Sequence, residues 1–106
     1  MSDDSYEARK IAQLERKKED YLDYVSKLNG YIESFDDSRK KIVESKEHFG
    51  NVYVDGKPFM TDKFEDVEAD MLQSLTYMNI CLQYANNSVR ECQASIDELK
   101  RKMEGN

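Results

Sequence analysis

The sequence predicts an all-α protein, an antiparallel two-helix hairpin of coiled-coil-like character with a short structured central loop. Its 106 residues include only four glycines and one proline, and 36% of them are charged, which is typical of long helices and coiled coils. Turn-forming residues gather at the midpoint, between residues 50 and 58, and apolar residues recur every seven positions on both sides. At this length we expect a single helical-hairpin domain over residues 1–106.

The first helix is expected over about residues 4–47. With Ile11 at heptad position a, every d position is apolar, while half of the a positions are basic. The d residues are Leu14, Tyr21, Leu28, Phe35, Ile42 and Phe49, and the a residues are Ile11, Lys18, Val25, Ile32, Arg39 and Lys46. Leu22, Tyr24, Tyr31 and Val43 widen this stripe, which favours packing on more than one neighbour. At Gly30 both a continuous helix and a kink or break are consistent with the pattern, since a helical glycine costs about 1 kcal/mol relative to alanine.

The connector is expected over residues 48–61 and allows two conformations. Val52–Val54 are strand formers followed by the turn pair Asp55-Gly56, so a short β-hairpin is one of them, although Pro58 limits its second strand. The sequence favours the other, a structured loop whose aromatic residues fold back over the end of the helix pair. These aromatic residues are Phe49, Tyr53 and Phe59. Thr61 or Asp62 is expected to cap the next helix, with Glu65 at position N3 relative to Asp62.

The second helix is expected over about residues 62–103 and carries apolar residues on two sides. One side has two rows spaced by seven, Phe64, Met71, Met78, Ala85, Cys92 and Leu99, and Leu75, Leu82, Val89, Ile96 and Met103. The small or short residues Val67, Ser74, Cys81, Ser88 and Ser95 lie between these rows. The opposite side carries Leu72, Tyr77, Ile80 and Tyr84, within a stretch from Met71 to Val89 that lacks charge. One neighbouring helix cannot cover both sides, so we expect these four residues to bind a partner; the alternative is that they pack on Tyr24 and Tyr31.

Composition and motifs disfavour several classes of function. A net charge of -6 argues against binding nucleic acid or an anionic membrane surface, and the eight polar residues within 71–89 argue against membrane insertion. The sequence shows no catalytic constellation, no metal-ligand cluster and no cofactor motif, and His48 stands alone. Cys81 and Cys92 are expected to be buried free thiols. With no apolar N-terminal stretch, no Sec signal peptide is expected, so we expect a non-catalytic cytoplasmic protein.

The central segment resembles the WXG-type small helical-hairpin proteins of type VII secretion. The Trp-x-Gly of that superfamily falls on Val54-Asp55-Gly56 with Tyr53 alongside and Phe59 following, and its apolar residue after the turn falls on Phe64. The tryptophan itself is absent. The export signal Tyr-x-x-x-Asp/Glu has no match either, because Cys81 follows Tyr77 and Ser88 follows Tyr84 at that spacing. The resemblance therefore points to the accessory branch in Gram-positive bacteria, whose members bind LXG toxins.

This resemblance implies a function in protein–protein interaction. The chain would bind the helical N-terminal domain of a type VIIb-secreted LXG toxin, with a second small helical accessory protein as a further candidate partner, and assist export of the toxin. It would act in the cytoplasm, and co-export with its partner is left open. The alternative is a coiled-coil structural subunit or prefoldin-like chaperone subunit that acts through self-assembly, with residues 52–56 in an assembly hairpin.

Overall fold

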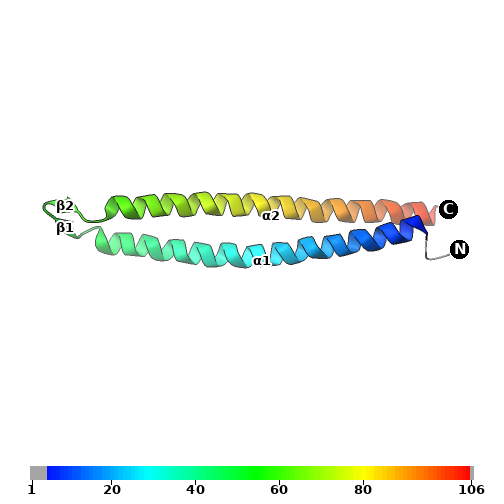
Figure 1. Ribbon diagram of the computed structural model, residues 1–106, viewed down its shortest axis with the longest axis horizontal. Coiled ribbons are helices and arrows are strands. Elements are labelled where there is room, and N and C mark those ends of the chain that lie inside the picture. Colours follow the sequence, from blue (N-terminus) through cyan, green and yellow to red (C-terminus); the bar gives the residue numbers. More distant parts are fainter. Residues whose placement is uncertain (1–4, 106) are drawn as a thin grey trace. The chain divides into compact units, whose positions relative to one another are not determined.

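The structure, a computed structural model that describes residues 5–105, is an all-α helical hairpin. Helix α1 (Tyr6–Phe49) and helix α2 (Thr61–Glu104) run antiparallel and are joined by strands β1 (Tyr53–Val54) and β2 (Lys57–Pro58), as Figure 1 shows. The predicted fold class is thereby confirmed. The chain divides into two compact units, described separately below: unit 1 joins the chain up to Leu28 with the chain from Cys81 onward, and unit 2 is Asn29–Ile80.

Helix α1 begins and ends at residues suited to those positions. The Ser5 hydroxyl accepts a hydrogen bond from the backbone N–H of Ala8 at 3.1 Å, which is N-cap geometry. At the other end the N–H of Gly50 donates to the carbonyl of Lys46 at 2.7 Å, and a Cβ on Gly50 would lie only 2.9 Å from that oxygen. Between these ends the helix continues through Gly30, so the structure has no break there.

The heptad positions of α1 point toward α2 in each unit. From residue 11 to residue 46 every a and d residue is half-buried or buried, including the basic ones, and only Phe49 at the end is exposed. In unit 1 the Nζ atom of Lys18 donates a 2.6 Å hydrogen bond to Oε1 of Gln93 in α2. The apolar stripe is widened by Leu22, Tyr24 and Tyr31, and these three residues remain exposed beside the packed face of α1.

The two apolar rows of α2 form the core with α1. In unit 1 the most buried side chains are Ala85 and Ile96, each 1% exposed, followed by Cys92. In unit 2 Leu75 has this role. The row of small residues is divided: Ser88 is buried and donates its hydroxyl hydrogen to the carbonyl of Tyr84 at 3.0 Å, whereas Cys81 is exposed. The expectation that both cysteines are buried is therefore wrong for Cys81.

The connector forms the β-hairpin rather than the loop that the sequence favours. Tyr53 pairs with Pro58 and Val54 with Lys57, and both turn residues have positive φ, 52° at Asp55 and 76° at Gly56, as a type I′ turn requires. Pro58 is compatible with this hairpin because it stands opposite Tyr53, at a position whose backbone donates no hydrogen bond to β1.

Two further expectations for the connector are wrong. Tyr53 and Phe59 do not cover the end of the helix pair but are exposed on the hairpin, whereas Phe49, itself partly exposed, stacks its ring on Phe64 at the start of α2. Thr61 does not cap α2: its Oγ1 atom is buried without a hydrogen-bond partner in the described chain. The helix instead begins after Met60, whose φ of 66° turns the chain and whose carbonyl accepts from the N–H of Phe64 at 3.1 Å.

Candidate functional site

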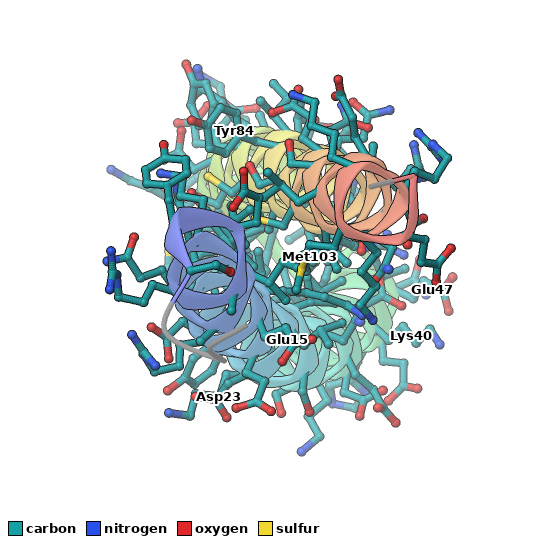
Figure 2. The ribbon with its side chains drawn as sticks, turned by 90° about the vertical axis from the view of Figure 1, so that its right-hand side faces the viewer. Glu15, Asp23, Lys40, Glu47, Tyr84 and Met103 are labelled. Carbon is teal, nitrogen blue, oxygen red and sulfur yellow. The ribbon has the colours of Figure 1, made fainter. Side chains whose placement is uncertain are left out.

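The four α2 residues expected to bind a partner are exposed. Leu72 has 58% of its surface exposed, Tyr77 59%, Ile80 55% and Tyr84 69%. Tyr84 projects outward from α2 in Figure 2. The alternative, burial of these residues against Tyr24 and Tyr31, has no support in these exposures, because those two tyrosines are 47% and 65% exposed themselves. The apolar residues on this side of α2 are therefore available to another molecule.

The structure separates these four residues by their surroundings. Leu72, Tyr77 and Ile80 belong to unit 2, and Tyr84 belongs to unit 1. Leu72 lines a groove between α1 and α2 of unit 2, and Tyr84 lines a groove between the helices of unit 1. Tyr77 and Ile80 line neither. The sequence placed them together because it reports helical spacing and not the position of the neighbouring helix.

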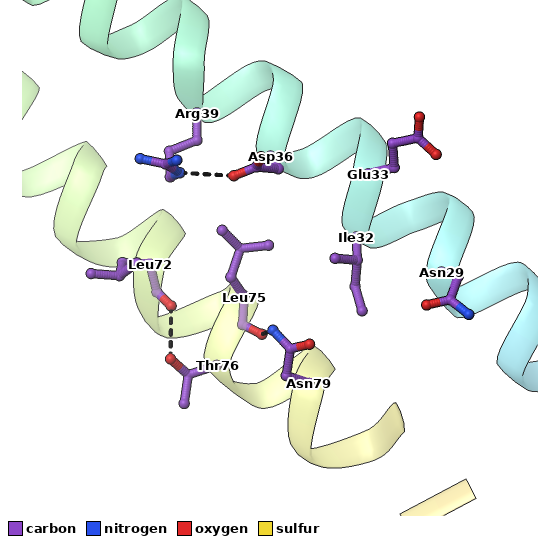
Figure 3. A pocket seen from close by; sticks show the side chains of 9 residues that line it. All are labelled: Asn29, Ile32, Glu33, Asp36, Arg39, Leu72, Leu75, Thr76 and Asn79. Carbon is purple, nitrogen blue, oxygen red and sulfur yellow. Dashed lines mark hydrogen bonds and ion pairs between the residues drawn. The ribbon is translucent and has the colours of Figure 1, made fainter. Parts of the chain in front are cut away.

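The groove in unit 2 has a volume of about 520 Å³ and is lined by side chains of α1 and α2 (Figure 3). Its apolar lining residues are Ile32, Leu72 and Leu75, and its polar lining residues are Asn29, Glu33, Asp36, Arg39, Thr76 and Asn79. The hydroxyl of Thr76 donates to the carbonyl of Leu72 at 3.1 Å, and the side-chain amide of Asn79 donates to the carbonyl of Leu75 at 3.0 Å. Because these donors are turned back onto their own helix, the α2 side of the groove presents mostly apolar surface.

Two ion pairs share the carboxylate of Asp36 on the α1 side of this groove. Arg39 Nε donates a 3.0 Å hydrogen bond to Oδ1 of Asp36, and Lys40 Nζ lies 3.6 Å from Oδ2 of the same carboxylate. The hydrogen bond from Arg39 holds the pKa of Asp36 below its usual value, and the nearby charges of Arg39 and Lys40 act in the same direction. The two cationic side chains therefore favour the charged form of the Asp36 carboxylate beside the groove.

The groove beside Tyr84 is smaller, at 250 Å³, and is lined by short side chains on the α2 side. The α2 side combines the short Ser88, Cys92 and Ser95 with the longer Tyr84 and Glu91, and the α1 side consists of Leu14, Lys17 and Tyr21. Short side chains leave room for a large side chain of another molecule next to the exposed ring of Tyr84. In the sequence, the row of small residues in α2 already indicated that another helix can approach closely on this side.

Tyr24 and Cys81 come together across unit 1, a contact that the sequence did not predict. Partial burial raises the pKa of the Tyr24 hydroxyl, and the neighbouring Cys81 side chain raises it further. Both residues are exposed, so this pair lies at the surface and not in the core. Heptad spacing places Cys81 in the row between the core rows of α2, so no signal in the sequence indicates this surface contact.

The four residues of the turn motif have separate roles. Phe64 is half-buried, and its ring stacks on that of Phe49 with centroids 6.1 Å apart and an interplanar angle of 11°. Gly56 supplies the second positive φ of the turn. Tyr53 and Phe59 are exposed on the hairpin and contact neither of those rings in the pairs that the structure records. The motif therefore forms a turn with an exposed apolar tip rather than one packed cluster.

The described chain, residues 5–105, offers no group of three or more His, Cys, Asp or Glu side chains that could hold a metal ion. Within the same residues neither helix has an apolar stretch of the length and hydropathy needed to cross a bilayer. Comparisons with protein-family models, with curated proteins and with solved structures find no match to this chain.

Proposed function

We propose that this chain is a non-catalytic accessory protein that binds the helical N-terminal domain of a type VIIb-secreted LXG toxin and assists its export. The observation that supports the proposal is the exposure of Leu72, Tyr77, Ile80 and Tyr84 within the uncharged part of α2. Tyrosine is among the residues that contribute most of the energy of protein interfaces, so the exposure of Tyr77 and Tyr84 here favours a partner. The resemblance of residues 52–64 to the turn of the WXG-type superfamily suggests which partner.

Binding would proceed by helix–helix packing. The grooves beside Leu72 and Tyr84 accept side chains of long helices, and their polar rims match the mixed character of a transient interface. A second small helical accessory protein is a candidate for the groove that the toxin domain leaves free. We place this step in the cytoplasm, before export, and the chain either remains there or leaves with the toxin.

Reconstitution with purified components tests this proposal. A tagged chain is first used to identify helical proteins from its own host by mass spectrometry, and the LXG domain found there is then purified and titrated by calorimetry. We expect a defined stoichiometric complex and a negative heat-capacity change from burial of apolar surface. A chain that binds no LXG domain in the purified system, while remaining helical, contradicts the proposal.

A further inference from the structure

The hairpin at the end of unit 2 exposes an unusual number of apolar side chains. We call residues 49–60 the tip. Its exposed large apolar residues are Phe49, Val52, Tyr53, Val54, Phe59 and Met60. Single exposed apolar residues are common on soluble proteins, but six within twelve residues form a patch that indicates an interaction site. Figure 1 shows β1 and β2 as a short hairpin between the end of α1 and the start of α2.

The hydrogen bonding of the hairpin decides which backbone groups face outward. The N–H of Phe59 donates to the carbonyl of Val52 at 2.8 Å, and Val54 pairs with Lys57 next to the turn. Backbone groups of successive strand residues point to alternate edges, so Val54 directs its N–H and C=O toward β2 and Val52 directs its carbonyl there, while the N–H of Val52 donates to the carbonyl of Phe49 at 3.0 Å. Tyr53, between them, directs both its N–H and its C=O to the outer edge of β1.

The outer edge of β2 is unsuited to pairing. The residue opposite Tyr53 is Pro58, which has no N–H to donate. Proline at such a position is one of the ways in which proteins prevent strand addition. Each tip therefore has one edge that can accept a further strand, and that edge is β1.

Charge favours a second copy of this chain at that edge. The tip carries one acid and one base, Asp55 and Lys57, whereas residues 62–70 carry five carboxylates and one lysine. Two copies of a chain with a net charge of -6 repel each other, and the neutral tip is where that repulsion is weakest. The outward groups of Tyr53 are also self-complementary, since one donor and one acceptor on each copy form two hydrogen bonds.

We propose that two copies of the chain pair antiparallel through their β1 edges, about a twofold axis at Tyr53. Each Tyr53 N–H donates to the Tyr53 carbonyl of the other copy, which gives a four-stranded sheet with β1 strands at its centre. Assembly stops at two copies because Pro58 closes both outer edges. The contact is smaller than the roughly 1,000 Å² of stable interfaces, so the dimer dissociates on dilution. This inference does not depend on the proposed accessory function.

Charge variants at Tyr53 test the pairing by sedimentation equilibrium over roughly 1 µM to 1 mM, the range expected for a small interface. The wild-type mass should rise with concentration from 12.4 kDa toward twice that value. Tyr53→Glu and Tyr53→Lys should each weaken dimerisation at least tenfold, because like charges then lie directly opposite each other. An equimolar mixture of the two variants should recover the dimer, since the charges are then opposite.

The matched control is Tyr6→Glu, the same substitution at an exposed tyrosine of unit 1, which should dimerise as wild type does. Circular dichroism checks that every variant keeps its helicity. A wild-type chain that stays at the monomer mass up to the highest concentration overturns the proposal. So does a Tyr53→Glu variant that dimerises like wild type, or a mixture that fails to recover the dimer.

Discussion

The Nζ atom of Lys46 lies 3.4 Å from Oε1 of Glu68 and 3.7 Å from Oε1 of Glu65, which ties a basic residue of the α1 heptad to α2. The side chains of Lys46 and Glu68 are 33% and 29% exposed, so the pair is partly withdrawn from solvent. Oε1 of Glu68 has no hydrogen-bond partner among the described residues, which leaves the ammonium group of Lys46 as its compensation. Pairing with these carboxylates allows the basic Lys46 to occupy a heptad position that faces α2.

Replacing Lys46 alone should destabilise the hairpin. Lys46→Met leaves the Glu68 carboxylate partly buried beside an apolar side chain, and we expect the free energy of unfolding to fall by about 1 kcal/mol. Adding Glu68→Leu should restore wild-type stability or exceed it, because a packed apolar pair needs no compensation. Urea unfolding of the four proteins of this double-mutant cycle measures the coupling. Equal stability of Lys46→Met and wild type would show that the ion pair contributes nothing.

The two glycines Gly30 and Gly56 should respond to alanine in opposite directions. Gly30 lies inside α1 with open space around it, so Gly30→Ala should raise the free energy of unfolding by about 0.5–1 kcal/mol through a less flexible unfolded chain. Gly56 has a φ of 76°, where an L-residue is strained, so Gly56→Ala should cost about 1–2 kcal/mol in the hairpin. Thermal unfolding measures the first, and amide exchange at Tyr53 the second. A destabilised Gly30→Ala would indicate that α1 does not continue through this residue.

Heptad spacing was sufficient to predict the helices and their core rows, since it depends only on which face of each helix is apolar. It placed Ile96 and Ala85 correctly in the core and also marked Leu72, Tyr77, Ile80 and Tyr84 as a surplus that α1 does not cover. Spacing does not report how closely two helices approach or where one lies around the other. For this reason the sequence missed the exposure of Cys81 and the separate grooves beside Leu72 and Tyr84.

The tip was harder to predict because two local signals disagreed there. Asp55-Gly56 favours a hairpin, whereas Pro58 and the marginal stability of short hairpins favour a loop. The decisive fact is register, which places Pro58 opposite Tyr53 at a position that needs no donor. The predicted cap of α2 is wrong for a similar reason. Thr61 and Asp62 have suitable side chains, but the chain turns at Met60, whose φ is positive, so α2 already begins at Thr61.

The two cysteines should differ in their accessibility to thiol reagents. Cys81 is exposed and Cys92 is 6% exposed, so a maleimide should label Cys81 in the folded protein and reach Cys92 only on unfolding. Mass spectrometry after a short pulse measures both rates. In Cys81→Ser, the matched control, only the slow reaction should remain. Comparable labelling of the two residues in native buffer would contradict the burial of Cys92.

Acid should weaken unit 2 partly through Asp36. Its pKa is lowered by the Arg39 hydrogen bond, so the carboxylate contributes stability above its ordinary pKa and loses that contribution as the pH falls through the lower folded value. In Asp36→Asn the decrease in stability between about pH 5 and pH 2 should be shallower than in wild type, and the difference should shrink in high salt. Asp37→Asn, at the exposed neighbouring residue, should follow the wild-type curve. Identical curves for Asp36→Asn and wild type would exclude this contribution.

The exposed residues of α2 give the sharpest test of partner binding. Ile80→Glu and Tyr84→Glu place a charge on a surface that is already solvated, so each should leave the helicity and unfolding midpoint within error of wild type. Each should weaken binding of the helical partner at least tenfold, because a buried unpaired carboxylate costs several kcal/mol at an interface. Gln13→Glu adds the same charge at an exposed position of α1, outside both grooves, and should bind normally. Joint loss of helicity and binding in the first two variants would instead assign Ile80 and Tyr84 to the core of the hairpin itself.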